Sequence, residues 1–198
     1  MLLAIVGNQT QTVYKASSPS MQNEIDIIRE ISQKFSHAGI EYMLTGSVAM
    51  NYYAQPRMTR DIDVVIALKP TDAEAIMSLF GDEYYVDSEA VGWAIAHESL
   101  FNMIHQESVI KVDCIVRKSG EYRRVEFDRR SEVRVQDLTT WIVSKEDLII
   151  SKLYWAKDSH SEFQLRDVRN LIGTGYDSEY LERWTNELGL HELFQECL

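Results

Sequence analysis

The sequence predicts a mixed α+β fold, in which helices flank a mixed β-sheet and a helical part follows towards the C-terminus. Two segments of alternating apolar residues, 61–68 and 109–116, have the period of half-buried strands. Helical periodicity dominates over about 21–36 and 71–80, and again from residue 144 onward. Strands that alternate with helices favour a sheet with helices packed on its faces.

Length and composition fit one globular unit with an appendage. The 198 residues, 45% of them hydrophobic, can bury one sizeable core, or a main domain with a small helical addition. We divide the chain into a loosely attached N-terminal extension at 1–19, a main domain at 20–143, and a helical region at 144–198 packed on that domain. Met21 is an alternative start of the chain.

Each element of this fold has a local signal. A first helix, from about Met21 to Ser36, carries apolar residues on one side, and Thr71 with Glu74 forms a capping box for a helix that ends at Phe80. The remaining expected elements are a strand at 42–45, a short helix at 48–53, a strand at 61–68, a helix at 88–96, strands at 101–105 and 109–116, one or two short strands before Trp141, and helices from Ser144 that break near 173–175 and Gly189.

Three acidic residues mark the two apolar strands. Successive side chains of a strand point to opposite faces, so Asp61 and Asp63 project from the same side while Ile62 faces a core. In the second strand the apolar face leaves Asp113 on the opposite, solvent-accessible side, together with Lys111. Three carboxylates on one sheet surface repel one another unless cations lie between them, and Mg²⁺ prefers such oxygen ligands. A pair of ions about 3.5 to 4 Å apart clamps the attacking and leaving oxygens of a phosphoryl transfer.

Gly46 and Ser47 stand between an expected strand and an expected helix. Gly46 has no Cβ, so it accepts an unusual backbone and lets a ligand approach closely. The following helix offers unpaired N–H groups to an anion, and Ser47 can cap that helix or contact phosphate. Because such a pair is often only a cap and a turn, its meaning depends on the acids that follow it.

These residues resemble, in order and kind, the motif of the DNA polymerase beta-like nucleotidyltransferase superfamily. That motif has an apolar residue, Gly with Gly or Ser, a spacer, Asp-x-Asp, and a third acid on a later strand. The rest of the chain is more weakly similar to small bacterial nucleotidyltransferases that include abortive-infection toxins of toxin–antitoxin pairs, and the segment 57–63 resembles that branch most. The residues that carry the motif are Leu44, Thr45, Gly46, Ser47, Asp61, Asp63 and Asp113, within about 40–116.

The resemblance implies a Mg²⁺-dependent enzyme that transfers a nucleoside monophosphate from a nucleoside triphosphate to a hydroxyl acceptor and releases pyrophosphate. It implies that Asp61 and Asp63 bind two Mg²⁺ ions, that Asp113 binds one of them and assists the acceptor hydroxyl, and that Gly46 and Ser47 cradle the triphosphate. The acceptor stays open among a tRNA end, a protein and a small hydroxylated molecule, and the toxin-like branch implies an antitoxin partner. A non-catalytic nucleotide-binding or regulatory module and a metal-dependent nuclease also stay open.

A lysine interrupts the apolar face of the helix that Ser144 and Asp147 are expected to cap. Lys152 either extends its stem along the core and its ammonium to water, or binds phosphate. The resembling small nucleotidyltransferases present a helix lysine to the nucleotide, which implies nucleotide binding by Lys152, with Lys145 as a weaker candidate. The apolar arc around Lys152 consists of Leu148, Ile149, Leu153, Trp155 and Ala156.

Arginines supply further phosphate-binding candidates. Arg57 precedes the acid pair and can grip phosphates through its fork of donors, whereas Arg60 is less suited to this role. The segment 117–134 is rich in basic residues, which either guide an anionic acceptor such as RNA or form a solvated β-hairpin rim, the interpretation that we favour. A net charge of −11 disfavours indiscriminate binding to nucleic acid.

Cysteine usage and hydropathy predict a cytoplasmic protein without a membrane anchor. The two cysteines, Cys114 and Cys197, provide no disulfide framework, which is typical of a reducing compartment. The apolar run at 2–6 is too short for a membrane span. The five histidines are scattered without ligand spacing, which argues against a zinc site.

Overall fold

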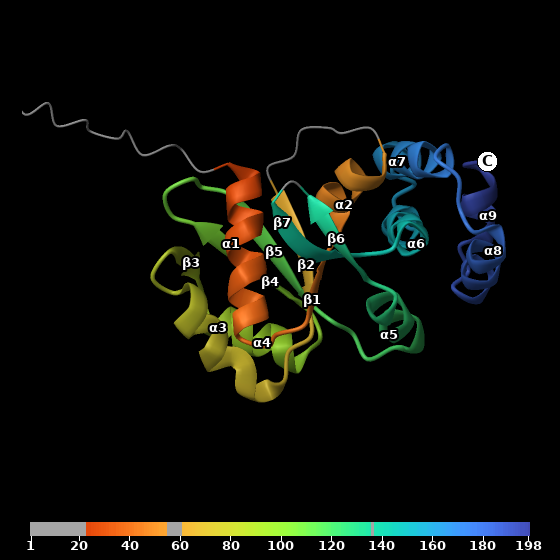
Figure 1. The fold of residues 1–198 in the computed structure, drawn as a ribbon. Coiled ribbons are helices and arrows are strands. Elements are labelled where there is room, and N and C mark those ends of the chain that lie inside the picture. The colour runs from red at the N-terminus through yellow and green to blue at the C-terminus, as the bar shows by residue number, and fades with distance from the viewer. Residues whose placement is uncertain (1–22, 55–60, 136) are drawn as a thin grey trace, which may run out of the picture.

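The computed structural model describes residues 23–54, 61–135 and 137–198, and it confirms the mixed α+β fold (Figure 1). Within this part of the chain the strands form one seven-stranded sheet. The strands are β1 (Tyr42–Leu44), β2 (Asp61–Ile66), β3 (Tyr84–Val86), β4 (Leu100–His105), β5 (Lys111–Val116), β6 (Ser131–Val135) and β7 (Leu138–Ile142). Their order is β3-β4-β5-β2-β1-β7-β6, with β2–β5 and β1–β7 parallel and the other neighbours antiparallel.

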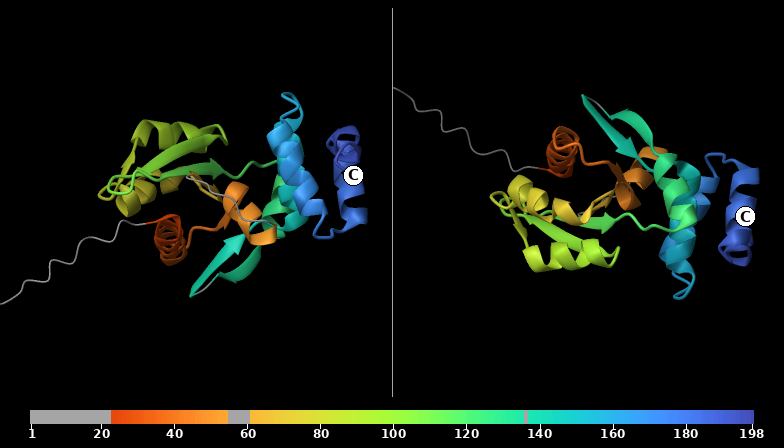
Figure 2. Two further views of the ribbon diagram at one scale, coloured as in Figure 1. Left: turned by 90° about the horizontal axis from the view of Figure 1, so that it is seen from above. Right: turned by 90° about the horizontal axis from the view of Figure 1, so that it is seen from below.

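Helices cover both faces of this sheet. The described helices are α1 (Glu24–His37), α2 (Gly46–Tyr53), the 3₁₀ turn η1 (Pro70–Asp72), α3 (Ala73–Phe80), α4 (Ser88–Ala96), α5 (Glu121–Asp128), α6 (Lys145–Ala156), α7 (Glu162–Ile172), α8 (Ser178–Glu187) and α9 (His191–Gln195). The helices α6 to α9 gather at one end of the molecule, away from α1 and α3 (Figure 2). Within the described ranges, no helix combines the length and the apolar character needed to cross a membrane.

The sheet separates two apolar cores. On one face, Ile62, Val64 and Ile66 of β2 pack with α1, α3 and α4. On the other face, Met43 of β1 and Ile142 of β7 pack with α2 and the C-terminal helices. Burial of one such side chain stabilises the fold by about 1.5–3 kcal/mol. A slip of β2 by one residue would therefore exchange its buried aliphatic side chains for aspartates, so the alternation fixes the register.

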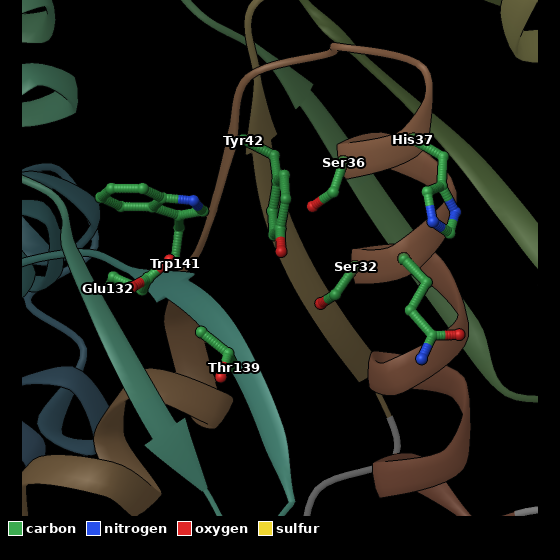
Figure 3. A pocket seen from close by; sticks show the side chains of 8 residues that line it. Ser32, Ser36, His37, Tyr42, Glu132, Thr139 and Trp141 are labelled. Carbon is green, nitrogen blue, oxygen red and sulfur yellow. The ribbon is translucent and has the colours of Figure 1, made fainter.

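A polar contact ties α1 to the sheet at the rim of a cavity of about 290 Å³. The hydroxyl groups of Ser32 and Thr140 lie 2.9 Å apart, and the Tyr42 hydroxyl lies 3.1 Å from that of Thr140. Figure 3 shows Ser32, Tyr42 and Trp141 around this cavity, between α1 and the β6–β7 pair. It lies on the face that α1 covers, opposite to the acidic side chains of β2.

Some expected elements differ from the observed ones. The segment expected as a hairpin rim contains the helix α5, because Tyr122, Glu126 and Phe127 form a buried face that includes a charged residue. Thr71 does not cap the helix that ends at Phe80. The chain first makes the turn η1, in which Asp72 accepts a hydrogen bond of 2.8 Å from the Lys69 N–H, and α3 begins after it. The extension at 1–19 and Met21 lie outside the described residues.

A buried carboxylate joins α5, α6 and α8. Ser144 caps α6 as expected, and its hydroxyl also donates to the Asp147 carboxylate at 2.6 Å. Asp147 is fully buried and also accepts hydrogen bonds from the hydroxyls of Tyr122 (3.1 Å) and Tyr180 (2.7 Å) and from the Arg129 guanidinium (3.1 Å). Because every one of these donors points at one side chain, the position of α6 depends on Asp147.

We expect Asp147→Ala to lower the free energy of unfolding by about 2–4 kcal/mol, because it leaves the hydroxyls of Tyr122 and Tyr180 without this acceptor and removes an ion pair of Arg129. Urea unfolding of the purified variant measures this loss. Glu187→Ala is the matched control, since its carboxylate forms an exposed pair with Arg183 at 2.9 Å and its removal should cost less than about 1 kcal/mol. Equal effects of the two substitutions would contradict the role of Asp147.

Candidate active site

The strands β2 and β5 place three carboxylates on one face of the sheet. These strands are parallel neighbours, and Asp63 is the register partner of Asp113, as Asp61 is of Lys111. Neighbouring strands lie about 4.8 Å apart, so the two register partners present their side chains side by side. Asp61 is exposed, whereas Asp63 and Asp113 are half-buried. The alternate residues of both strands are buried in the core on the other face.

Gly46 brings the start of α2 against the Asp63 carboxylate. Its φ of +57° lies in the left-handed region, and a Cβ at this position would lie 1.9 Å from Asp63 Oδ2. The Thr45 N–H donates to the Asp63 carbonyl at 2.9 Å, and the Ser47 N–H donates to the Asp63 carboxylate. Only glycine permits this close approach, so the first turn of α2 and the acid of β2 form one unit.

Among the described residues, Lys111 balances part of the negative charge on this face. Burial raises the pKa of Asp63, and the nearby Asp113 and Asp61 raise it further, while the Ser47 N–H and Lys111 oppose the shift. The Lys111 ammonium lies 2.9 Å from Asp113 Oδ2 and 3.9 Å from Asp61 Oδ2. Its hydrogen bond to Asp113 raises the pKa of Lys111. The Lys111 ammonium thus pairs with one carboxylate on each of the two strands.

The donor set fits a divalent cation such as Mg²⁺. Asp113 Oδ1 is buried and has no hydrogen-bond partner among the described residues, an arrangement that costs free energy unless a cation binds there. Among the described residues, no three carboxylate, histidine or cysteine side chains converge on one point. The Lys111 ammonium lies between Asp61 and Asp113 and contacts both. Cation binding therefore requires displacement of Lys111, whose half-exposed ion pairs contribute little stability.

Lys152 lies on the buried face of α6, as its position in the apolar arc suggested, but its ammonium does not reach water. It donates to Asp167 Oδ2 of α7 at 2.7 Å and to Gln164 Oε1 at 3.3 Å. The side chains of Lys152 and Asp167 are only 6% and 1% exposed. The alternative of a solvated ammonium is therefore wrong, and binding of nucleotide phosphate by Lys152 stays a prediction that requires this pair to open. Trp155, expected on the same buried arc, is 66% exposed.

The other cationic candidates lie in different settings. Arg57 and Arg60 fall outside the described residues. Lys145 donates to the carbonyl of Thr174 at 3.4 Å, at the start of α6. Within the basic segment 117–134, three arginines form ion pairs with acids of the fold, which removes them from a continuous basic surface. These pairs are Arg123 with Glu126 (2.8 Å), Arg129 with Asp147 (3.1 Å) and Arg130 with Glu41 (2.6 Å).

Sequence reasoning assigned no role to two polar neighbours of the acids. Lys111 shares a strand face with Asp113, and that spacing was the available signal for its ion pair. Asn102 of β4 is the register partner of Asp113 on the other side of β5, and its side chain is exposed on the same face. The sequence does not show that Asn102 lies beside Asp113, because that placement depends on the pairing of β4 with β5 in the folded sheet.

Comparison with known proteins supports the fold. No protein-family model matches the sequence, and neither does any curated protein. A solved structure of the lincosamide antibiotic adenylyltransferase LnuA with lincomycin bound is similar at a TM-score of 0.54 and 19% identity, over 77% of this chain and 98% of that chain. The antibiotic-resistance factor ANT(2'')-Ia is similar at a TM-score of 0.59 and 13% identity, over 87% and 94%.

A third similar structure is an antigenic nucleotidyltransferase-like protein from Paracoccidioides brasiliensis, with a TM-score of 0.55 and 16% identity over 86% of this chain and 90% of that chain. At such identities the similarity establishes the fold. The chain therefore has the nucleotidyltransferase fold, with Gly46 and the acids of β2 and β5 on one face of its sheet.

We expect Gly46→Ala to lower the free energy of unfolding by about 1–3 kcal/mol, because alanine is strained at this φ and its Cβ displaces the Asp63 carboxylate. Chemical denaturation measures the loss. Gly92→Ala in α4 is the control, since no atom lies within 4 Å of its added Cβ and a helix interior favours alanine. A Gly46→Ala protein as stable as the Gly92→Ala protein would show that the close approach is not required.

A second pair of variants separates a structural role of Lys152 from nucleotide binding. Lys152→Met should lower the free energy of unfolding by about 3–5 kcal/mol, because it leaves Asp167 buried without this partner. The double variant Lys152→Met with Asp167→Leu should recover most of that stability in thermal unfolding. Titration of the double variant with ATP and Mg²⁺ then tests the phosphate contact. A tenfold or greater loss of affinity supports nucleotide binding by Lys152, and an affinity equal to that of the exposed control Lys157→Met assigns Lys152 to the buried pair alone.

Proposed function

We propose that this protein is a Mg²⁺-dependent nucleotidyltransferase that transfers a nucleoside monophosphate from a nucleoside triphosphate to a hydroxyl acceptor. The observation that carries the proposal is the joint placement of three features on one face of the sheet. The N-terminus of α2 lies against Asp63, Asp113 is the register partner of Asp63, and Asp61 projects from the same side. A helix N-terminus suits phosphate, and the carboxylates suit the cations that accompany it.

In this reaction the acceptor oxygen forms a bond to the α-phosphorus, the bond from that phosphorus to the bridging oxygen of the β-phosphate breaks, and pyrophosphate leaves. Gly46 and Ser47 would lie against the terminal phosphates and orient them, and Arg57 would add a cationic contact. Asp61, Asp63 and Asp113 would hold two Mg²⁺ ions, which supply charge neutralisation for the phosphates. Asp113 would also take the proton of the acceptor hydroxyl, since its Oδ1 has no described hydrogen-bond partner.

The similar solved structures favour an adenylyl donor and a small acceptor. LnuA is described as an adenylyltransferase of lincosamide antibiotics, and a crystal structure of ANT(2'')-Ia contains adenylyl-2''-tobramycin. We therefore propose ATP as the donor and a small hydroxylated molecule as the acceptor, ahead of a tRNA end or a protein side chain. A cell supplies both ATP and Mg²⁺ in the cytoplasm, where we place the protein.

The toxin-like interpretation concerns the biological setting of the same chemistry. It is supported by the segment 57–63, of which residues 57–60 lie outside the described part of the chain. In that setting the acceptor is an essential RNA or protein, and an antitoxin neutralises the enzyme. Expression in a bacterial host distinguishes the settings, because a toxin arrests growth in a way that depends on Asp63 and Asp113.

The alternative function is a nucleotide-binding module without turnover. This alternative is supported by the ion pairs of Lys111 with Asp61 and Asp113, which offset the repulsion between these carboxylates without a metal. Metal-dependent ATP binding without pyrophosphate release, in the presence of a cell extract as a source of acceptors, would favour the module. Labelling of an extract component from α-labelled ATP would favour the transferase and would identify the acceptor.

We expect Asp63→Asn to abolish Mg²⁺-dependent ATP binding and to stabilise the metal-free protein at pH 7–8 by roughly 0.5–2 kcal/mol. The pKa of Asp63 is raised in the folded state, so its protonated carboxyl group stabilises the wild type fully below the unfolded pKa, and this stability is lost as the pH rises through the folded pKa. Asp63→Asn should therefore be more stable than the wild type at pH 7–8 and lose this advantage in acid. Calorimetry of ATP with and without Mg²⁺, and denaturation at pH 3.5 and pH 7.5, measure these effects.

The exposed acid Glu74 of α3 provides the control, since Glu74→Gln should change neither ATP binding nor the pH profile. Unaltered Mg²⁺-dependent binding by Asp63→Asn would show that Asp63 is not a metal ligand. Destabilisation of that variant at pH 7.5 would instead make its carboxylate part of the fold.

A further inference from the structure

Two exposed tryptophans from distant parts of the chain line one cavity. Trp93 of α4 and Trp155 of α6 are 57% and 66% exposed, although indole rings usually bury most of their surface. Both line a cavity of about 420 Å³, whose apolar lining also includes Leu100 and Ile115. We call this space the tryptophan cavity. Its volume lies within the range of small-molecule sites, about 300–1,000 Å³.

The tryptophan cavity adjoins the acidic face. Leu100 and Ile115 are register partners in β4 and β5, and Asn102 and Asp113 are the next partners on the same face. Two residues of a strand span about 7 Å, so Ile115 places the cavity roughly that far from Asp113. A ligand of modest length can therefore occupy the cavity and present a hydroxyl group to Asp113.

The tryptophan cavity and the turn at Gly46 lie on opposite sides of the acidic residues. The sheet order runs β4, β5, β2, β1, and Gly46 follows β1, so β5 and β2 with their carboxylates separate the two places (Figure 1). In an in-line displacement the attacking oxygen and the leaving pyrophosphate lie on opposite sides of the phosphorus. With the terminal phosphates at α2, the β4 side is where the acceptor approaches.

The lining indicates the chemical class of the occupant. One wall is held in place, because the His97 imidazole stacks on the Trp93 indole with ring centres 4.4 Å apart, and its Nδ1 lies 2.8 Å from the Trp93 carbonyl. Indole surfaces favour a flat apolar or aromatic ring system. The acidic and basic side chains of the lining, Glu98 and Lys118, are opposite in charge, so they provide no polyanion track for RNA.

We infer that the tryptophan cavity binds the acceptor, and that the acceptor is a small molecule in which a flat apolar ring system is joined to a hydroxyl-bearing group. This inference rests on the proposed nucleotidyl transfer and names its substrate class. Trp93 and Trp155 contact the ring system, and Asp113 takes the proton of the hydroxyl that attacks the α-phosphorus.

The test uses 2-naphthyl β-glucoside, which joins a flat bicyclic ring to sugar hydroxyls, and methyl β-glucoside, which lacks the ring. Calorimetric titration of the full chain should show at least tenfold tighter binding of the naphthyl compound. Trp93→Ala and Trp155→Ala should each weaken that binding about three- to tenfold. Tyr85→Ala, which removes an exposed aromatic ring of β3, should not weaken it. Thermal unfolding confirms that each variant remains folded, and ATP affinity is measured on the same samples.

Each outcome decides the inference. Selective loss of naphthyl glucoside affinity in both tryptophan variants, with ATP affinity unchanged, supports it. Equal affinity for the two glucosides, or no effect of the tryptophan variants, overturns it. Weakened ATP binding in those variants would overturn it by making the cavity a nucleobase site, and displacement of the probe by a short RNA would overturn the small-molecule class. Failure of the wild-type chain to bind ATP with Mg²⁺, despite tight naphthyl glucoside binding, identifies failure of the proposed function itself.

Discussion

The close approach of the Gly46 backbone to the Asp63 carboxylate is the constraint on which the rest of the site depends. The space between them admits no Cβ, and the Thr45 N–H fixes β1 beside β2 at the same rung. The chain then turns directly into α2, so the N-terminus of a helix and the Asp63 carboxylate share one rigid unit. Because β5 pairs with β2 in a fixed register, this unit also determines where Asp113 stands relative to the helix.

Charges within the protein compensate part of the repulsion among the carboxylates of this unit. Lys111 is held by the two outer carboxylates, whereas Asp63 lies deeper and relies on the Ser47 N–H and the positive end of α2. Burial and the nearby Asp113 and Asp61 keep the pKa of Asp63 raised, although the Ser47 N–H and Lys111 oppose the shift. Since partly exposed ion pairs contribute little stability, Lys111 can leave at small cost when a divalent cation arrives.

The predictability of each feature depends on whether its cause is local in the sequence. Strand alternation placed Asp61 and Asp63 on one face, and the fold class followed from such periods and from the motif. Helix α5 was missed because periodicity assigns charged residues to the surface, whereas Glu126 is buried against Arg123 and Ser151. Helical periodicity alone does not show which helices pack against α6. It therefore predicted neither the exposure of Trp155 nor the ion pair between Lys152 and Asp167.

Buried polar contacts among the C-terminal helices influence the tryptophan cavity. Asp147 fixes α6 against α5 and α8, and Lys152 fixes it against α7. Both contacts are geometrically specific, unlike apolar packing, so they restrict the rotation of α6 about its axis. That rotation determines whether Trp155 faces the tryptophan cavity or bulk solvent, because the ring lies on the exposed side of the helix. The sheet therefore supplies the groups that suit phosphate chemistry, while charges buried between helices set the shape of the neighbouring cavity.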